Sequence, residues 1–171
     1  MIRRLALVAL VALAGATSAA AATPQKFTPA KLAGTWAGTW TNQTFKTTGT
    51  LTLKISSSHN ALAFAATITG NTFGCAAPTP QAFKLPAGKG ANHWTAKGFN
   101  LSNPSPAFGK MNVTYAYPSG ALTGSGQGPA CAPGISWTLT GKFTATRFSA
   151  TAHITLPGNG TATTVVSLKK K

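Results

Sequence analysis

Hydrophobic and polar residues alternate along most of the chain beyond residue 34, which is the pattern of β-strands with one buried face. The alternation is clearest at Leu51–Ile55, Leu62–Ile68, Met111–Tyr117 and Phe148–Leu156, and a β-branched run follows at Thr161–Leu168. Clusters of Ser, Asn, Pro and Gly separate these runs, as turns require. The sequence therefore predicts about eight to ten strands and no long helix.

The first predicted strand, residues 32–42, carries two tryptophans on one face. Trp36 and Trp40 are an even number of residues apart, so both rings point the same way on a strand. Just before them, Thr28 followed by Pro29 is typical of the start of a helical turn. We expect one such turn, ending at Leu32, at an end of the sheet, and an inward face rich in aromatic volume.

Regular strands joined by turns, with no second composition regime, indicate one domain over residues 23–171. The predicted fold is all-β, a single antiparallel up-and-down β-barrel of about eight to ten strands. A β-sandwich is the alternative.

Residues 1–22 have the three parts of a bacterial-type signal peptide. Arg3 and Arg4 precede an apolar run at residues 5–13, and small residues fill 14–22. An uncleaved membrane anchor is the alternative, but the apolar run is about half of the ~20 residues that a spanning helix needs. We expect a secreted or periplasmic protein.

The chain has two cysteines, Cys75 and Cys131, each in a loop-like stretch of Ala, Pro and Gly. An even number of cysteines in an exported protein predicts a disulfide. A reactive thiol pair is the alternative, although neither cysteine lies in a Cys-x-x-Cys motif.

The charge composition excludes several kinds of chemistry. The sequence has 15 Lys and Arg residues and neither Asp nor Glu. Paired-carboxylate glycosidases, aspartic dyads, Ser-His-Asp triads and carboxylate-based calcium or magnesium sites all need the missing residues. The histidines, His59, His93 and His153, lack ligand-like spacing. We expect a protein that is not an enzyme and that uses no metal and no cofactor.

Two explanations of the charge remain open. One is an anionic partner, such as an envelope polymer or lipid headgroups. The other is an acidic habitat, where a structural protein without carboxylates has almost nothing to protonate. Specific nucleic-acid binding is not expected, because Arg147 is the single Arg beyond the signal peptide.

Aromatic residues in phase with apolar neighbours indicate a packed core or the wall of a ligand cavity. For the cavity, we expect lining by Trp94, Tyr115 and Trp137, which combine an apolar body with a polar tip, and by His93 near a barrel mouth. The ligand would be small and apolar or amphipathic.

The motifs Gly34-Thr35-Trp36 and Gly38-Thr39-Trp40 resemble the first strand of calycin-type barrels, the group of lipocalins, avidins and fatty-acid-binding proteins. The resemblance implies a barrel in which Trp36 and Trp40 are structural. In lipocalins an Arg from a late strand lies over the motif Trp, a place that Arg147 would fill. Asn42 falls where avidins contact biotin, whereas their closing Asp has no counterpart here.

Overall fold

The computed structural model describes residues 29–58, 61–75, 81–86, 95–96, 108–109, 111–116 and 119–171. The predicted signal peptide lies outside this part. The elements are α1 (Pro29–Leu32), β1 (Gly34–Asn42), β2 (Thr48–Ser58), β3 (Ala61–Ile68), β4 (Gln81–Pro86), β5 (Thr95–Ala96), β6 (Met111–Ala116), β7 (Ala121–Gln127), β8 (Ser136–Phe143), β9 (Arg147–Thr155), a 3-10 turn at Pro157–Asn159, and β10 (Thr161–Lys170).

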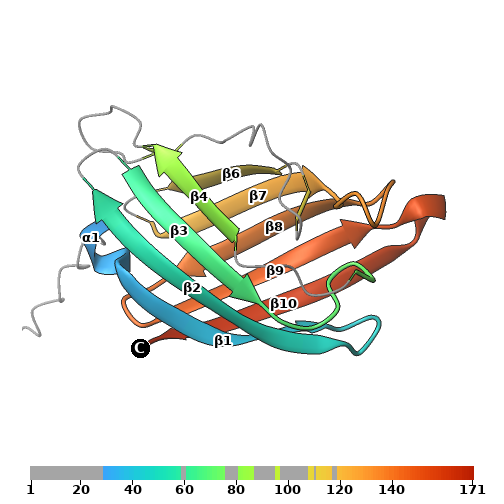
Figure 1. The fold of residues 1–171 in the computed structure, drawn as a ribbon, viewed down its shortest axis with the longest axis horizontal. Helices are drawn as coiled ribbons and strands as arrows, with labels where there is room; N and C mark the ends of the chain where they lie inside the picture. Colours follow the sequence, from blue (N-terminus) through green and yellow to red (C-terminus); the bar gives the residue numbers. More distant parts are fainter. Residues whose placement is uncertain are drawn as a thin grey trace, which may run out of the picture.

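All ten described strands belong to one antiparallel sheet, in the order β4-β3-β2-β1-β10-β9-β8-β7-β6-β5. Each strand pairs with its neighbour in sequence, except that β1 also pairs with β10 and no β4–β5 pairing is found among the described residues. The sheet curls round on itself, with β1 to β4 facing β6 to β9 across the interior (Figure 1). The predicted all-β, up-and-down antiparallel fold is confirmed, as a barrel-like sheet.

The first strand is buried as its pattern predicts. Trp36 is fully buried and Trp40 is 4% exposed, while Thr39 between them is exposed. The Trp40 ring packs closely against the backbone of two glycines, because a Cβ added at Gly49 would be 2.5 Å from its Nε1 and one at Gly70 would be 2.8 Å from its Cζ2. Glycines on neighbouring segments therefore make the space for this ring.

One end of the barrel is filled with side chains, and we call it the closed end. Here α1, the β6–β7 turn, the β8–β9 turn and the end of β10 come together (Figure 1). The largest fully buried side chains lie here: Leu32, Trp36, Leu62, Tyr115, Phe143 and Leu168. The predicted helical turn is confirmed as α1, and the Trp36 indole N–H donates to its Leu32 carbonyl at 2.8 Å.

The predicted cation over the motif Trp is a lysine rather than Arg147. Lys170 places its Nζ 5.6 Å from the centroid of the Trp36 ring and donates to the Lys31 carbonyl at 2.6 Å. Arg147 is exposed on the outer face, because it precedes the inward-facing Phe148 by one position on β9. The register of β9 thus corrects the role expected for Arg147.

A disulfide joins Cys75 to Cys131, as the sequence predicts, with the Cα atoms 6.1 Å apart. Cys75 follows β3, and Cys131 lies between β7 and β8. In the sheet order, β3 and β8 are separated by β2, β1, β10 and β9. The bridge therefore connects two distant parts of the sheet at the end opposite α1.

Candidate functional site: a cavity at the open end

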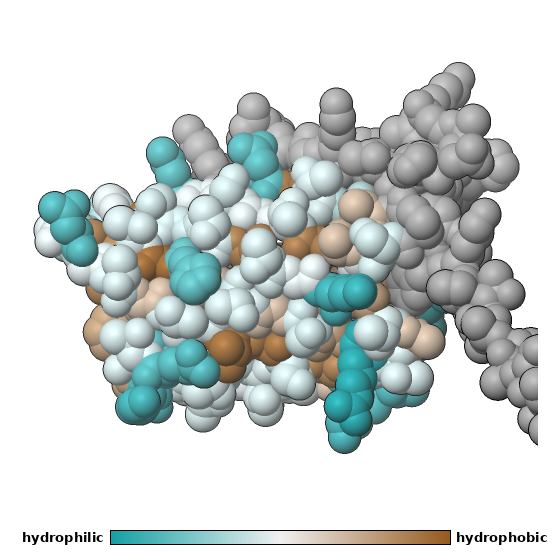
Figure 2. All heavy atoms as spheres, turned by 180° about the vertical axis from the view of Figure 1, so that it is seen from behind, coloured by the Kyte–Doolittle hydropathy of each residue, from teal (hydrophilic) through white to brown (hydrophobic). Residues whose placement is uncertain are grey.

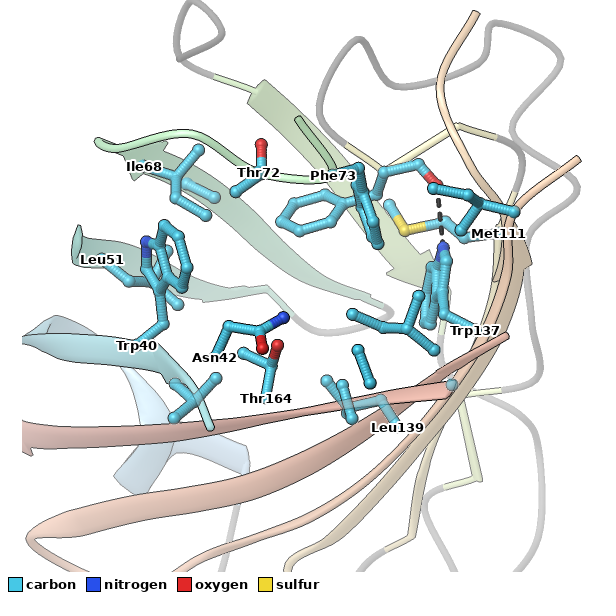
Figure 3. Close-up of a pocket in the computed structure, with 18 of the residues that line it drawn as sticks. Trp40, Asn42, Leu51, Ile68, Thr72, Phe73, Met111, Trp137, Leu139 and Thr164 are labelled. Atoms are coloured by element: carbon cyan, nitrogen blue, oxygen red, sulfur yellow. Dashed lines mark hydrogen bonds between the residues drawn. The ribbon is translucent and has the colours of Figure 1, made fainter. Parts of the chain in front are cut away.

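The interior toward the opposite end, which we call the open end, holds a cavity of about 480 Å³. The open end is formed by residues 43–47, 69–75, 128–135 and 156–160. The volume falls within the range of small-ligand sites. Figure 3 shows side chains from both halves of the sheet converging on this space.

The walls are almost entirely apolar, because the inward positions of the strands carry aliphatic and aromatic residues. Those drawn around the centre of the cavity in Figure 3 include Trp40, Leu51, Ile68, Phe73, Met111, Trp137 and Leu139. The floor is formed by Phe143 and Phe148, whose rings stack at 4.2 Å and which also pack in the closed end.

Both tryptophans of the wall have their polar atoms occupied. Trp40 Nε1 donates to the Thr69 carbonyl at 2.9 Å, and Trp137 Nε1 donates to the Phe108 carbonyl at 3.0 Å. Each acceptor lies 29 residues away in sequence, so the bonds also hold the loops against the strands. With their N–H groups paired, the indoles present apolar surface to the cavity.

Asn42 is the best-defined polar group in the wall. Its Oδ1 accepts hydrogen bonds from the backbone N–H groups of Thr44 and Phe45, both at 2.9 Å. These bonds fix the orientation of the amide and leave Nδ2 as a donor. Nδ2 points into the cavity beside Thr164, which is paired with Asn42 across β1 and β10 (Figure 3).

The lining has no charged side chain among the described residues. Its remaining polar members are Thr47, Asn71, Thr72 and Thr164. Thr72 is 9% exposed, and within the described structure its Oγ1 has no hydrogen-bond partner. The polar contribution to the cavity is therefore neutral.

The rim carries an exposed aromatic side chain. Phe45, in the β1–β2 turn, is 55% exposed and also lines the cavity. The segment of Thr72, Phe73 and Gly74 lies across the rim and ends at the bridged Cys75. The disulfide thus anchors part of the cavity wall.

Of the four residues predicted to line a ligand cavity, the structure describes Trp137 and Tyr115, and it places one in the cavity wall and the other outside it. Trp137 lines the cavity, as expected. Tyr115 does not, which corrects the expectation. It is fully buried in the closed end, 6.2 Å from the Phe143 ring. Along β6, Met111 and Val113 reach the cavity, and Tyr115 lies beyond its floor. Trp94 and His93 lie outside the described residues.

Several wall residues escaped sequence reasoning. Trp40 was expected to be structural and also lines the cavity, whereas Phe73 and Thr164 carry no motif. The resemblance to avidins is what indicates Asn42 in the sequence. Its place at the end of a strand and the start of a turn is a further signal, because Asn side chains at such positions accept hydrogen bonds from the backbone of the turn.

Of the three histidines, one lies in the part of the chain that the structure describes. His153 faces outward and is exposed, while His59 and His93 lie outside the described residues. No group of three or more His, Cys, Asp or Glu side chains that could hold a metal is present in the ranges described. Within them, no helix has the length and apolar character needed to cross a membrane.

The comparisons with known proteins bear on the fold. No family model and no curated protein matches the chain. Among solved structures, it is similar to a protein of unknown function from the DUF3598 family of Nostoc punctiforme PCC 73102, with a TM-score of 0.50 and 14% identity. The match covers 85% of this chain and 49% of that one. The chain therefore spans about half the length of that protein and shares a β fold with it.

Proposed function

We propose that the protein is an exported, non-catalytic binding protein for a small, uncharged and largely apolar ligand that carries a hydrogen-bond acceptor. The supporting observation is the apolar cavity of about 480 Å³ at the open end. The disulfide fits an oxidising compartment outside the cytoplasm.

The apolar character of the ligand follows from the walls. Removing apolar surface from water is favourable by about 25 cal/mol per Å². The indole N–H groups of Trp40 and Trp137 already donate to backbone carbonyls, so they need no hydrogen-bond partner on the ligand. A ligand that fills this space buries most of its own surface. The main source of affinity is therefore apolar burial.

The hydrogen-bond acceptor that we propose on the ligand is inferred from Asn42. Its Nδ2 is a donor of fixed orientation in an apolar setting. A buried donor left without a partner is unfavourable by about 1–3 kcal/mol. A ligand with an ester, amide or ketone oxygen at this point would satisfy it.

The absence of net charge follows from the described lining, which holds no Lys or Arg. An ionised carboxylate buried there, away from the exposed Lys46 at the rim, would have no counter-charge in the described lining, and such burial is strongly unfavourable. Of two otherwise equal ligands, we expect the neutral one to bind more tightly.

The test uses the neutral fluorophore N-phenyl-1-naphthylamine, displaced in turn by methyl laurate and by laurate. We expect saturable binding of the probe, and displacement by the ester at least about tenfold more effective than by the ionised acid. A protein that binds no neutral probe, or that prefers the acid, would overturn the proposal.

Two matched variants locate the binding. Leu139→Trp adds volume to the cavity, while Thr140→Trp adds the same side chain at the next, outward-facing position of β8. Probe affinity should fall at least about tenfold for L139W and stay unchanged for T140W, with both variants folded by circular dichroism. Equal affinities for the two variants would place the probe elsewhere.

A further inference from the structure

Seven of the eight Lys and Arg side chains that the structure describes lie at the closed end, so the described positive charge is not evenly spread. They are Lys31, Lys54, Lys142, Arg147, Lys169, Lys170 and Lys171. The eighth, Lys46, lies in the β1–β2 turn at the open end. The sequence, in which the lysines are scattered, does not reveal this grouping.

Four of the closed-end cations, Lys54, Lys142, Arg147 and Lys169, lie at outward positions of the strands, whereas Lys170 extends over the Trp36 ring. Lys169 and Arg147 are directly opposite each other on β10 and β9. Lys142 pairs with Ser149, the next outward position of β9 after Arg147. On the other side, Thr35 accepts the backbone N–H of Lys171 and pairs with Lys54 of β2. The outward cations thus lie on β2, β10, β9 and β8 at the closed end, with none on β1 between them.

This arrangement is unfavourable for the isolated protein. Like charges directly opposite on adjacent strands destabilise a sheet, and the chain has neither Asp nor Glu to offset them. Figure 2 shows the outer face as mostly weakly polar, with hydrophilic side chains standing in separate places and hydrophobic residues visible between them. An anionic partner would remove the repulsion that the closed end concentrates.

The geometry favours a flat partner over a linear polymer. The cations surround the end of a barrel, whereas strand-like polyanions are bound along charged grooves. Among the described residues, the exposed large hydrophobic side chain is Phe45, at the opposite end. In its described part, the closed end therefore offers charge without an exposed large apolar side chain.

We propose that the closed end docks by electrostatic attraction on the surface of an anionic lipid bilayer, with the mouth of the cavity directed away from it. Docking leaves the rim at residues 43–47 and 69–75 free. Because the interaction is between exposed charges, it weakens as salt shortens the screening length, which is about 10 Å at 0.1 M.

The experiment measures the partition of the full mature protein onto vesicles of phosphatidylcholine, with and without phosphatidylglycerol. The key variant moves two charges and keeps the net charge: Lys142→Gln and Arg147→Gln at the closed end, with Gln43→Lys and Gln127→Lys at exposed positions of the open end. A control variant carries Gln43→Lys and Gln127→Lys alone.

We expect the wild type to bind the anionic vesicles, to dissociate from them as salt is added, and not to bind the neutral vesicles. The charge-moving variant should bind at least about tenfold less, since each surface charge contributes several-fold. The control variant should bind no less than the wild type. Equal partition of the wild type and the charge-moving variant would overturn the proposal, because net charge alone would explain the binding. Binding to soluble polyphosphate without binding to vesicles would overturn it as well.

Discussion

Reduction of the Cys75–Cys131 disulfide should destabilise the fold substantially. The two cysteines are 56 residues apart in sequence, and their bridge closes a loop that contains β4, β5, β6 and β7. In the chain-entropy model, a loop of this length stabilises the folded state by about 4 kcal/mol. For a domain of this size, that corresponds to a fall in Tm of about 10 °C.

The magnitude is large here because of what the loop encloses. It contains the edge strands β4 and β5, between which the structure describes no pairing. Without the bridge, the described contacts between the arm ending in β4 and the arm ending in β5 are the β1–β10 side of the sheet and the packed core of the closed end, and both lie away from the rim. We therefore expect reduction to loosen the rim and to lower probe affinity as well as stability.

The assay is urea unfolding of the wild type, oxidised and fully reduced, with free thiols verified by alkylation. With a slope of about 2 kcal/mol per M, the midpoint should fall by about 2 M on reduction. The variant Cys75→Ala with Cys131→Ala serves as the control, since its midpoint should not respond to the reductant. If the fully reduced wild type unfolds within about 0.3 M of the oxidised form, the argument from loop closure is refuted.

Other predictions concern the core, the cavity and pH. Trp36→Ala should destabilise the protein by about 3–5 kcal/mol, since the ring is fully buried and its N–H caps α1, whereas Thr39→Ala on the exposed face should change stability by less than about 0.5 kcal/mol in the same urea assay. Asn42→Asp keeps the turn acceptor but replaces the cavity donor with a carboxylate, so methyl laurate should bind at least about tenfold more weakly while the midpoint falls less than in Asn42→Ala. Between pH 5 and pH 2, Tm at fixed ionic strength should stay nearly flat, because neither the folded nor the unfolded chain has a carboxylate side chain to protonate. A steep fall of Tm over that range would contradict this last expectation.

The alternation of side chains was enough to predict the class of fold. Positions such as Leu51, Leu53 and Ile55 point inward because the strand period is two, and this holds whatever their partners are. The helical turn at α1 was predicted from local chemistry, and the disulfide from the presence of two cysteines in a chain expected to be exported. Local rules of this kind need no knowledge of the register.

The site was less predictable because it depends on depth along the barrel axis. Tyr115 and Met111 have the same inward phase on β6, but one lies in the packed end and the other in the cavity wall. Phase alone does not tell them apart. Lys170, and not Arg147, lies over the Trp36 ring because of the register of β9 and β10, and no local pattern in the sequence gives that register.

The pairing of β1 with β10 sets the order of events when the protein folds. Lys31 and Lys170 meet across a separation of 139 residues, so the seam cannot form until nearly the whole chain has been released from the machinery that makes or exports it. Until then, one edge of β1 is an unpaired strand edge, which other chains can recruit into aggregates. Contacts this distant in sequence also slow folding. The interval before the last strand pairs with β1 is therefore the stage of folding at which we expect the risk of aggregation to be greatest.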